Sequence, residues 1–245
     1  MIDKAHLRIA VSVALVLAGF ATKAHAAPTP ITTCTTLTRP GSYVLANNLV
    51  AAGDCLVVAA QFVTIDLAGF VIAGNGTGTG LQATGLRLGI SISNGTIARF
   101  FNGVDLQNTA TNVYVEKMRF VGNSNVGLDL GDAAIVKDSV FSQNGTAARI
   151  GFRSVVRDNT SNSNQVGFII GGGSTVVGNV ASINTAHGFI VSNGSSIVNN
   201  SSLGNTGFGM YVVCPSNIVE NTSTVNGTNL QLEGSGCSST SNVAP

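Results

Sequence analysis

The sequence predicts an exported all-β protein, a single right-handed parallel β-helix whose coils are about 21 residues long. Three observations carry this prediction. The N-terminus has the features of a signal peptide, apolar and polar residues recur with a common period, and four cysteines fall into two pairs about one period apart. No stretch repeats its apolar residues with helical spacing, so a helical solenoid is excluded.

Residues 1–26 have the three parts of a cleavable signal peptide. Lys4 and Arg8 form a basic start, Ile9 to Ala21 is apolar, and Ala24-His25-Ala26 provides a small-residue cleavage site. The apolar run is too short to cross ~30 Å of hydrocarbon. We therefore expect a secreted or periplasmic protein with no membrane segment after signal removal.

Composition limits the range of functions. Of the 245 residues, 44% are hydrophobic and 9% are charged, and the net charge is +1. Disordered chains combine low hydrophobicity with high net charge, so this chain is expected to have an ordered core. Lys and Arg form no run, which argues against a nucleic-acid partner.

Three series of residues recur in step along the chain. They are the apolar strand starts Ile90, Val113, Ile135, Val155, Val176, Ile197 and Ile218; the asparagines Asn102, Asn123, Asn144, Asn164, Asn184, Asn205 and Asn226; and the set Asp138, Asp158, Asn179, Asn200 and Asn221. Three short strands per period make one coil, and coils stack at the ~4.8 Å strand spacing. We expect the second series to form a continuous internal ladder that satisfies backbone groups at a corner, which is a structural role.

One strand of the coil can be interpreted residue by residue, because segments beginning at Gly103, Gly127, Gly167, Gly188 and Gly209 align. Alternation predicts two inward sets: Val104, Leu128, Phe168, Phe189 and Met210, then Leu106, Leu130, Ile170, Val191 and Val212. The outward row is Asp105, Asp129, Arg149, Ile169, Ile190 and Tyr211. Its last three members predict an exposed apolar ridge for a ligand or for self-association, unless residues 238–245 cover it.

The ends of a β-helix need protection because they present unpaired strands. Residues 27–62 contain prolines that break the repeat and are assigned to an N-terminal cap, residues 63–237 to the β-helix, and residues 238–245 to a C-terminal tail. Cys34 and Cys55 are 21 residues apart, and Cys214 and Cys237 are 23 apart. These spacings place each pair on neighbouring coils, so we predict disulfides Cys34–Cys55 and Cys214–Cys237.

The segment Phe62-Val-Thr-Ile-Asp-Leu-Ala-Gly-Phe-Val-Ile-Ala-Gly74 resembles the opening coil of bacterial exported right-handed β-helix-repeat proteins in the pectin-lyase-like superfamily. The repeated coils from 90 to 232 resemble the same group. Members of that group include polysaccharide lyases, hydrolases and epimerases as well as adhesins and autotransporter passengers. The resemblance therefore implies the fold, and it leaves the activity open.

Charged residues gather in one zone, with thirteen of them between Arg99 and Asp158. A lyase-like or epimerase-like enzyme acting on an acidic glycan would use this zone, with Arg149, Arg153, Lys137 and Asp129 as candidate catalytic residues. In a lyase, Asp105 and Asp129 would be candidate Ca²⁺ ligands. The alternative is a solvated face in which opposite charges offset each other, and the spacing predicts that Lys117, Lys137 and Arg157 stack on it.

Several features argue against catalysis. The Tyr, Asp and His cluster of epimerases of this fold is missing from the sequence, and His187 is expected to be an exposed turn residue. Coils between residues 113 and 218 are too short to carry the long loops that build a cleft. The preferred prediction is thus a non-catalytic surface-binding or scaffold module without metal or cofactor, with cell-wall or extracellular polysaccharide as its partner. Asp105, Asp129, Arg149, Ile169, Ile190 and Tyr211 are its candidate binding residues.

Overall fold

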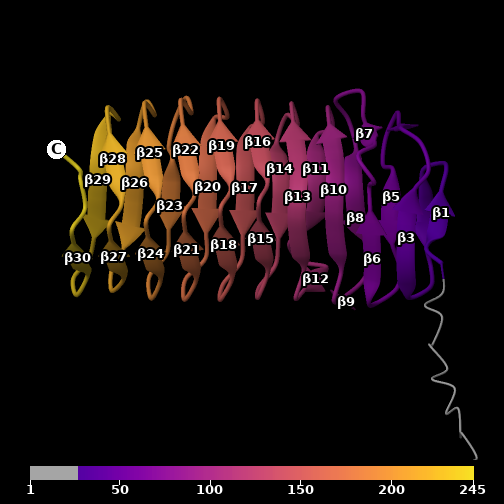
Figure 1. Ribbon diagram of the computed structural model, residues 1–245, viewed down its shortest axis with the longest axis horizontal. Helices are drawn as coiled ribbons and strands as arrows, with labels where there is room; N and C mark the ends of the chain where they lie inside the picture. The colour runs from indigo at the N-terminus through magenta and orange to yellow at the C-terminus, as the bar shows by residue number, and fades with distance from the viewer. Residues whose placement is uncertain (1–26) are drawn as a thin grey trace, which may run out of the picture.

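The computed structural model describes residues 27–245, and the predicted signal peptide lies outside them. Strands and turns build this part of the chain, which contains no helix, and so no helix that could cross a membrane. Successive strands stack in parallel into a solenoid of about 10 turns, with the strands side by side along the long axis (Figure 1). The predicted parallel β-helix with coils of about 21 residues is confirmed.

Each coil contributes strands to three columns. The first column contains β1 (Thr29–Ile31), β3 (Gly41–Leu45), β6 (Val63–Asp66), β15 (Ile135–Lys137), β18 (Val155–Arg157), β21 (Thr175–Val177), β24 (Ser196–Val198), β27 (Asn217–Val219) and β30 (Ser238–Thr240). The second contains β4 (Leu49–Val50), β7 (Val71–Ala73), β16 (Val140–Ser142), β19 (Thr160–Asn162), β22 (Val180–Ser182), β25 (Ser201–Leu203) and β28 (Thr222–Thr224). Two long strands, β10 (Ser91–Ala98) and β13 (Tyr114–Val121), run through both columns and join them into one 18-stranded sheet.

The third column is a separate 10-stranded sheet. It contains β2 (Thr35–Leu37), β5 (Leu56–Val58), β8 (Thr79–Ala83), β11 (Asn102–Leu106), β14 (Val126–Leu130), β17 (Thr146–Ile150), β20 (Val166–Ile170), β23 (Phe189–Val191), β26 (Phe208–Val213) and β29 (Thr228–Glu233). A small additional pair joins β9 (Arg87–Leu88) to β12 (Ala110–Thr111).

The apolar core lies between the two large sheets. All ten residues predicted to point inward from the third column are buried. Phe120 stacks on Phe141 with ring centroids 5.0 Å apart, and Phe168 stacks on Phe189 at 5.4 Å. Copies of the same position therefore contact each other from coil to coil, as the repeat requires.

Asparagine ladders occupy two of the corners, and a serine ladder occupies a third. In the first ladder, the backbone N–H and the side-chain amide of Asn144 both donate to Oδ1 of Asn164, at 2.9 Å each. Equivalent bonds link Asn123, Asn144, Asn164, Asn184, Asn205 and Asn226. This predicted ladder is confirmed from Asn123 onward.

One detail of the ladder prediction is wrong. Asn102 lies outside the ladder, on the outer face, where its side chain accepts from Asn125 and donates to Asp105. The second ladder runs through Ser139, Asn159, Asn179, Asn200, Asn221 and Asn242. No ladder was predicted for the third series of the sequence, and two of its members, Asp138 and Asp158, lie one residue before the ladder positions.

The cause of that shift is a left-handed residue at the corner. Asp138 and Asp158 have φ of 53° and 59°, and the residue that follows each one turns inward to join the ladder. Sequence periodicity does not reveal which of two adjacent polar residues takes the left-handed conformation. In the first column, strand alternation directs Val136, Val156 and Val176 inward and leaves Ile135 exposed.

Both chain ends carry strands of the solenoid. Within the segment assigned to a cap, β1 pairs with β3 and β2 with β5 in parallel register. Within the segment assigned to a tail, β30 pairs with β27, and Asn242 completes the second ladder. The predicted disulfides are present, with Cys34 bonded to Cys55 and Cys214 to Cys237. Two disulfides indicate an oxidising, extracellular environment.

Candidate functional site

The outer face of the third column carries the predicted outward row in register. Asp105 pairs with Asp129, Asp129 with Arg149, and Arg149 with Ile169. The row continues through Ile190 and Tyr211. Strand pairing at ~4.8 Å therefore places these side chains in one line along the solenoid axis, which is the arrangement the alternation predicts.

Asp129 and Arg149 form the ion pair at the centre of this row. Arg149 Nη1 lies 2.6 Å from Asp129 Oδ2, and the side chains are 35% and 6% exposed respectively. Burial raises the pKa of the Asp129 carboxyl, and the charge of Arg149 only partly opposes that rise. Oδ1 of Asp129 is buried without a hydrogen-bond partner among the described residues, so this carboxylate is incompletely satisfied.

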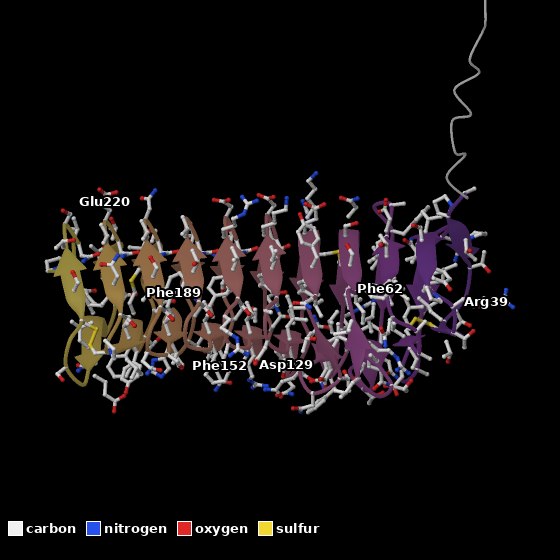
Figure 2. The ribbon with its side chains drawn as sticks, turned by 90° about the horizontal axis from the view of Figure 1, so that it is seen from below. Arg39, Phe62, Asp129, Phe152, Phe189 and Glu220 are labelled. Atoms are coloured by element: carbon white, nitrogen blue, oxygen red, sulfur yellow. A yellow bond between two sulfur atoms is a disulfide. The ribbon has the colours of Figure 1, made fainter. Side chains whose placement is uncertain are left out.

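A groove of about 360 Å³ follows the edge where strands β14, β17 and β20 end. Its lining includes Gln107, Asn108, Asp132, Arg149, Phe152 and Ile169. Asp129 and Phe152 lie on the same side of the solenoid, away from Glu220 (Figure 2). The groove therefore combines amide, charged and apolar side chains on the face of the predicted row.

Phe152 is the most exposed apolar residue of the groove, at 54%. The corner that carries it is fixed by Asp132, whose Oδ1 accepts the Phe152 N–H at 3.0 Å and whose Oδ2 pairs with Arg153 at 3.0 Å. Sequence analysis missed Phe152. An alignment of corners could have found it, because the equivalent positions are Asp132, Gly172 and Asn193, which are polar or small.

The apolar half of the row contains more aromatic surface than was predicted. His187 stacks on Phe208 with ring centroids 5.1 Å apart, and Phe208 lies 5.3 Å from Tyr211. His187 is half-buried, and its Nδ1 accepts the Phe208 N–H at 3.0 Å, so the expectation of an exposed turn histidine is wrong. Tyr211 donates to Glu233, and this hydrogen bond raises the pKa of the Tyr211 phenol.

The predicted stack of basic residues is also corrected. Lys137 pairs with Arg157 on one side, but its neighbour on the other side is Glu116 and not Lys117. Lys137 Nζ lies 2.8 Å from Glu116, which raises the pKa of Lys137 and, with burial opposing it, lowers that of Glu116. Lys137 belongs to the first column, so it is not brought together with Asp129, Arg149 and Arg153.

The candidate Ca²⁺ ligands have protein partners. Asp105 accepts from Asn102 at 3.1 Å, and Asp129 is paired with Arg149. Within residues 27–245, no three His, Cys, Asp or Glu side chains are grouped so that they could hold a metal ion.

Comparison with solved structures supports the fold. The chain is similar to the A-module of the mannuronan C-5 epimerase AlgE6 from Azotobacter vinelandii, with a TM-score of 0.54 and 13% identity over 88% of this chain and 76% of that chain. The A-module of mannuronan C-5 epimerase AlgE4 from the same organism matches with a TM-score of 0.39 and 13% identity, over 83% and 71% of the two chains. No known family profile and no curated protein sequence matches the chain. At 13% identity, the likeness to AlgE6 shows a shared fold.

Proposed function

We propose that the protein is an exported, non-catalytic binding module that holds an extracellular polysaccharide along the outer face of the third column. The observation that carries this proposal is the groove in which the exposed ring of Phe152 lies beside Arg149, Gln107 and Asn108. Sugar rings present apolar faces and hydroxyl edges. Aromatic surface and side-chain hydrogen-bonding groups are complementary to them.

The charge of the groove also bears on the ligand. Arg149 is paired with Asp129, and Arg153 with Asp132, so these four groups add no net charge. A ligand that binds through hydroxyl groups does not have to break either ion pair. The row of Ile169, Ile190 and Tyr211 extends the contact surface along the axis, so that a long chain fits better than a single sugar.

Binding of a panel of cell-wall polysaccharides, measured by isothermal titration calorimetry, tests the proposal. We expect Phe152→Ala to weaken binding about tenfold or more, as loss of a central aromatic contact does. Ile190→Asp should weaken binding while the circular dichroism spectrum is unchanged. Val140→Ala is the matched control, because Val140 is an exposed apolar residue, at 41%, on the other sheet. Equal affinities of the Phe152 and Val140 variants would count against the groove.

One observation favours a second candidate, a lyase-like or epimerase-like enzyme acting on an acidic glycan. Asp129 is a buried carboxyl group with a raised pKa beside a groove, and such perturbed groups are candidates for acid–base catalysis. The fold neighbour is named as a mannuronan C-5 epimerase module. Arg149 and Arg153 would then neutralise substrate carboxylates, which requires them to exchange their aspartate partners.

Activity assays separate the two candidates. We expect no turnover of polymannuronate or polygalacturonate with added Ca²⁺, followed by nuclear magnetic resonance for epimerisation and by ultraviolet absorbance for an unsaturated product. Turnover that is lost in both Asp129→Asn and Arg149→Ala would replace the binding proposal with the enzymatic one.

A further inference from the structure

A pocket of about 370 Å³ lies on the 18-stranded sheet, which is a different sheet from that of the groove. It is lined by Gly69, Asn94, Gly95, Thr96, Lys117 and Arg119, and we call it the basic pocket. Lys117 and Arg119 come from the long strand β13, and Asn94 and Thr96 come from β10 in the coil before it.

The pocket is formed by a difference in corner length between neighbouring coils. Asp66 pairs with Ser93 and Val71 with Thr96, so residues 67–70 of one coil correspond to residues 94–95 of the next. The longer corner carries two additional residues, and its turn is held by Asp66, whose Oδ1 accepts the Ala68 N–H at 2.8 Å and the Asn94 side-chain amide at 3.2 Å. This turn forms a wall of the pocket beside Lys117 and Arg119.

The turn is also packed against the next coil. A Cβ at position 95 would collide with the side chain of Leu67, so Gly95 permits the close approach of the two corners. Leu67 itself is fully buried. The wall of the basic pocket is therefore a fixed part of the solenoid.

Most cations of the charged zone are paired with a carboxylate, and within the described part of the chain Lys117 and Arg119, like Arg99, are not. Lys137, Arg149, Arg153 and Arg157 each have a carboxylate within 4.0 Å, whereas Lys117 and Arg119 have none among residues 27–245. No carboxylate lines the pocket, and its other side chains are the amide of Asn94 and the hydroxyl of Thr96. Two cations without a carboxylate within 4.0 Å among the described residues, beside the hydroxyl group of Thr96, are complementary to an anion.

Lys117 also occupies a corner position with a left-handed backbone conformation. Lys117 has φ of 52°. Five equivalent corner positions carry residue types that tolerate this conformation well, namely Asn94, Asp138, Asp158, Gly178 and Asn199, and a sixth carries Glu220. A lysine at such a position is a less favourable choice for the backbone.

We infer that the basic pocket binds an oxyanion, namely a carboxylate or sulfate group, through Lys117 and Arg119. Its volume is sufficient for a single ring that bears such a group. The anion has two chemical sources, a charged residue of an acidic polysaccharide or a free anion. This inference does not depend on the groove of the third column.

The test uses the mature protein and three probes: inorganic sulfate, a short oligogalacturonate and a neutral oligosaccharide of the same length. Backbone amide shifts of Asn94, Gly95 and Thr96 report binding at low ionic strength. Oligogalacturonate should shift these signals and the neutral sugar should not. A larger affinity for oligogalacturonate than for sulfate would assign the site to an acidic polymer, and equal affinities would assign it to a free anion.

Substitutions then identify the binding groups. Lys117→Asn suits the left-handed corner, and with Arg119→Gln it should weaken anion binding about tenfold or more, because each side chain contributes a charge-assisted hydrogen bond. Arg157→Gln is the matched control, since Arg157 is exposed on the same sheet and already paired with Asp158. The inference is overturned if no anion shifts these signals, or if the double variant and the control bind equally. Phe152→Ala should leave this site unchanged, which separates its outcome from that of the groove.

Discussion

The coils between Arg99 and Asp158 and those between Asn159 and Val219 share one frame but differ in charge. Both regions stack the same three columns, bury the same apolar positions and carry the same corner ladders. The first region has thirteen charged residues, and the second has none. The coil architecture therefore does not depend on charged residues.

This difference distinguishes the side chains that stabilise the fold from the charged side chains that only lie on its surface. Apart from the pair of Arg149 with the buried Asp129, the ion pairs of the first region are at least partly exposed, and such pairs contribute about 0–1 kcal/mol each. The buried asparagines occur in both regions, and each accepts a hydrogen bond from a backbone N–H group that would otherwise be buried without a partner. Stability thus rests on the core and the ladders, which leaves the charges of the first region available for recognition.

Removal of the disulfide that follows the uncharged region should have the largest effect. Changing Cys214 and Cys237 to Ser opens a loop of 23 residues, which is expected to cost about 3 kcal/mol. We expect loss of monomer in size-exclusion chromatography before any change in circular dichroism, because the last coil opens first. Changing Cys34 and Cys55, which close 21 residues, is the comparison at the other end. Unaltered monomer in the first variant would contradict a capping role.

Ladder substitutions test whether the two regions depend equally on their asparagines. Asn184→Ala leaves the buried N–H of Asn164 without its acceptor and should lower the free energy of unfolding by about 1–3 kcal/mol. Asn144→Ala, in the charged region, should cost the same, as measured by urea denaturation. The control is Asn193→Ala, an exposed corner residue whose loss should be nearly neutral. A much smaller cost at Asn144 would mean that ion pairs compensate for the ladder.

Corner strain is a smaller effect and has the opposite sign. Ile183 is 60% exposed and has φ of 54°, a conformation that β-branched residues rarely adopt. Ile183→Gly should therefore raise the free energy of unfolding by about 1 kcal/mol. Val180→Gly, on the neighbouring strand β22, should lower it, because Gly in a strand has no such strain to relieve. Destabilisation by both variants would show that the corner is not strained.

The smallest expected effect concerns Asp129 and pH. Its pKa is raised above the ordinary 3.8 in the folded protein, so the unfolded chain releases this proton first as the pH rises. The contribution of Asp129 to stability therefore falls as the pH rises from 3.8 to the pKa of Asp129 in the folded protein, and it stays low at higher pH. Asp129→Asn should remove this decline in urea denaturation curves taken across the acidic range. Glu116 has a lowered pKa, so its contribution to stability rises with pH, and it does so equally in the wild type and in Asp129→Asn. Parallel pH profiles of variant and wild type would contradict the assignment.

The sequence predicted the features that recur in every coil. Coil length, disulfide pairs and the two faces of the third column all follow from periodicity, because stacked copies share one environment. Asn102 was placed wrongly because Phe100, which follows the left-handed Arg99, occupies the corner position equivalent to Asn123. Phe152 and the pair of Lys117 and Arg119 were missed as site residues because they depend on corner shape, and corner shape is where one coil differs from the next.

The ladders also give the solenoid a direction. Each ladder oxygen accepts hydrogen bonds from the coil that precedes it in the chain, as Asn164 does from Asn144. Each coil thus supplies the acceptor for the backbone donor of its predecessor, and its own ladder amide also donates back to that coil, as Asn164 does to the carbonyl group of Phe141. The ladder therefore has a polarity, because its backbone bonds run from donors in one coil to acceptors in the next, from the N-terminal towards the C-terminal end.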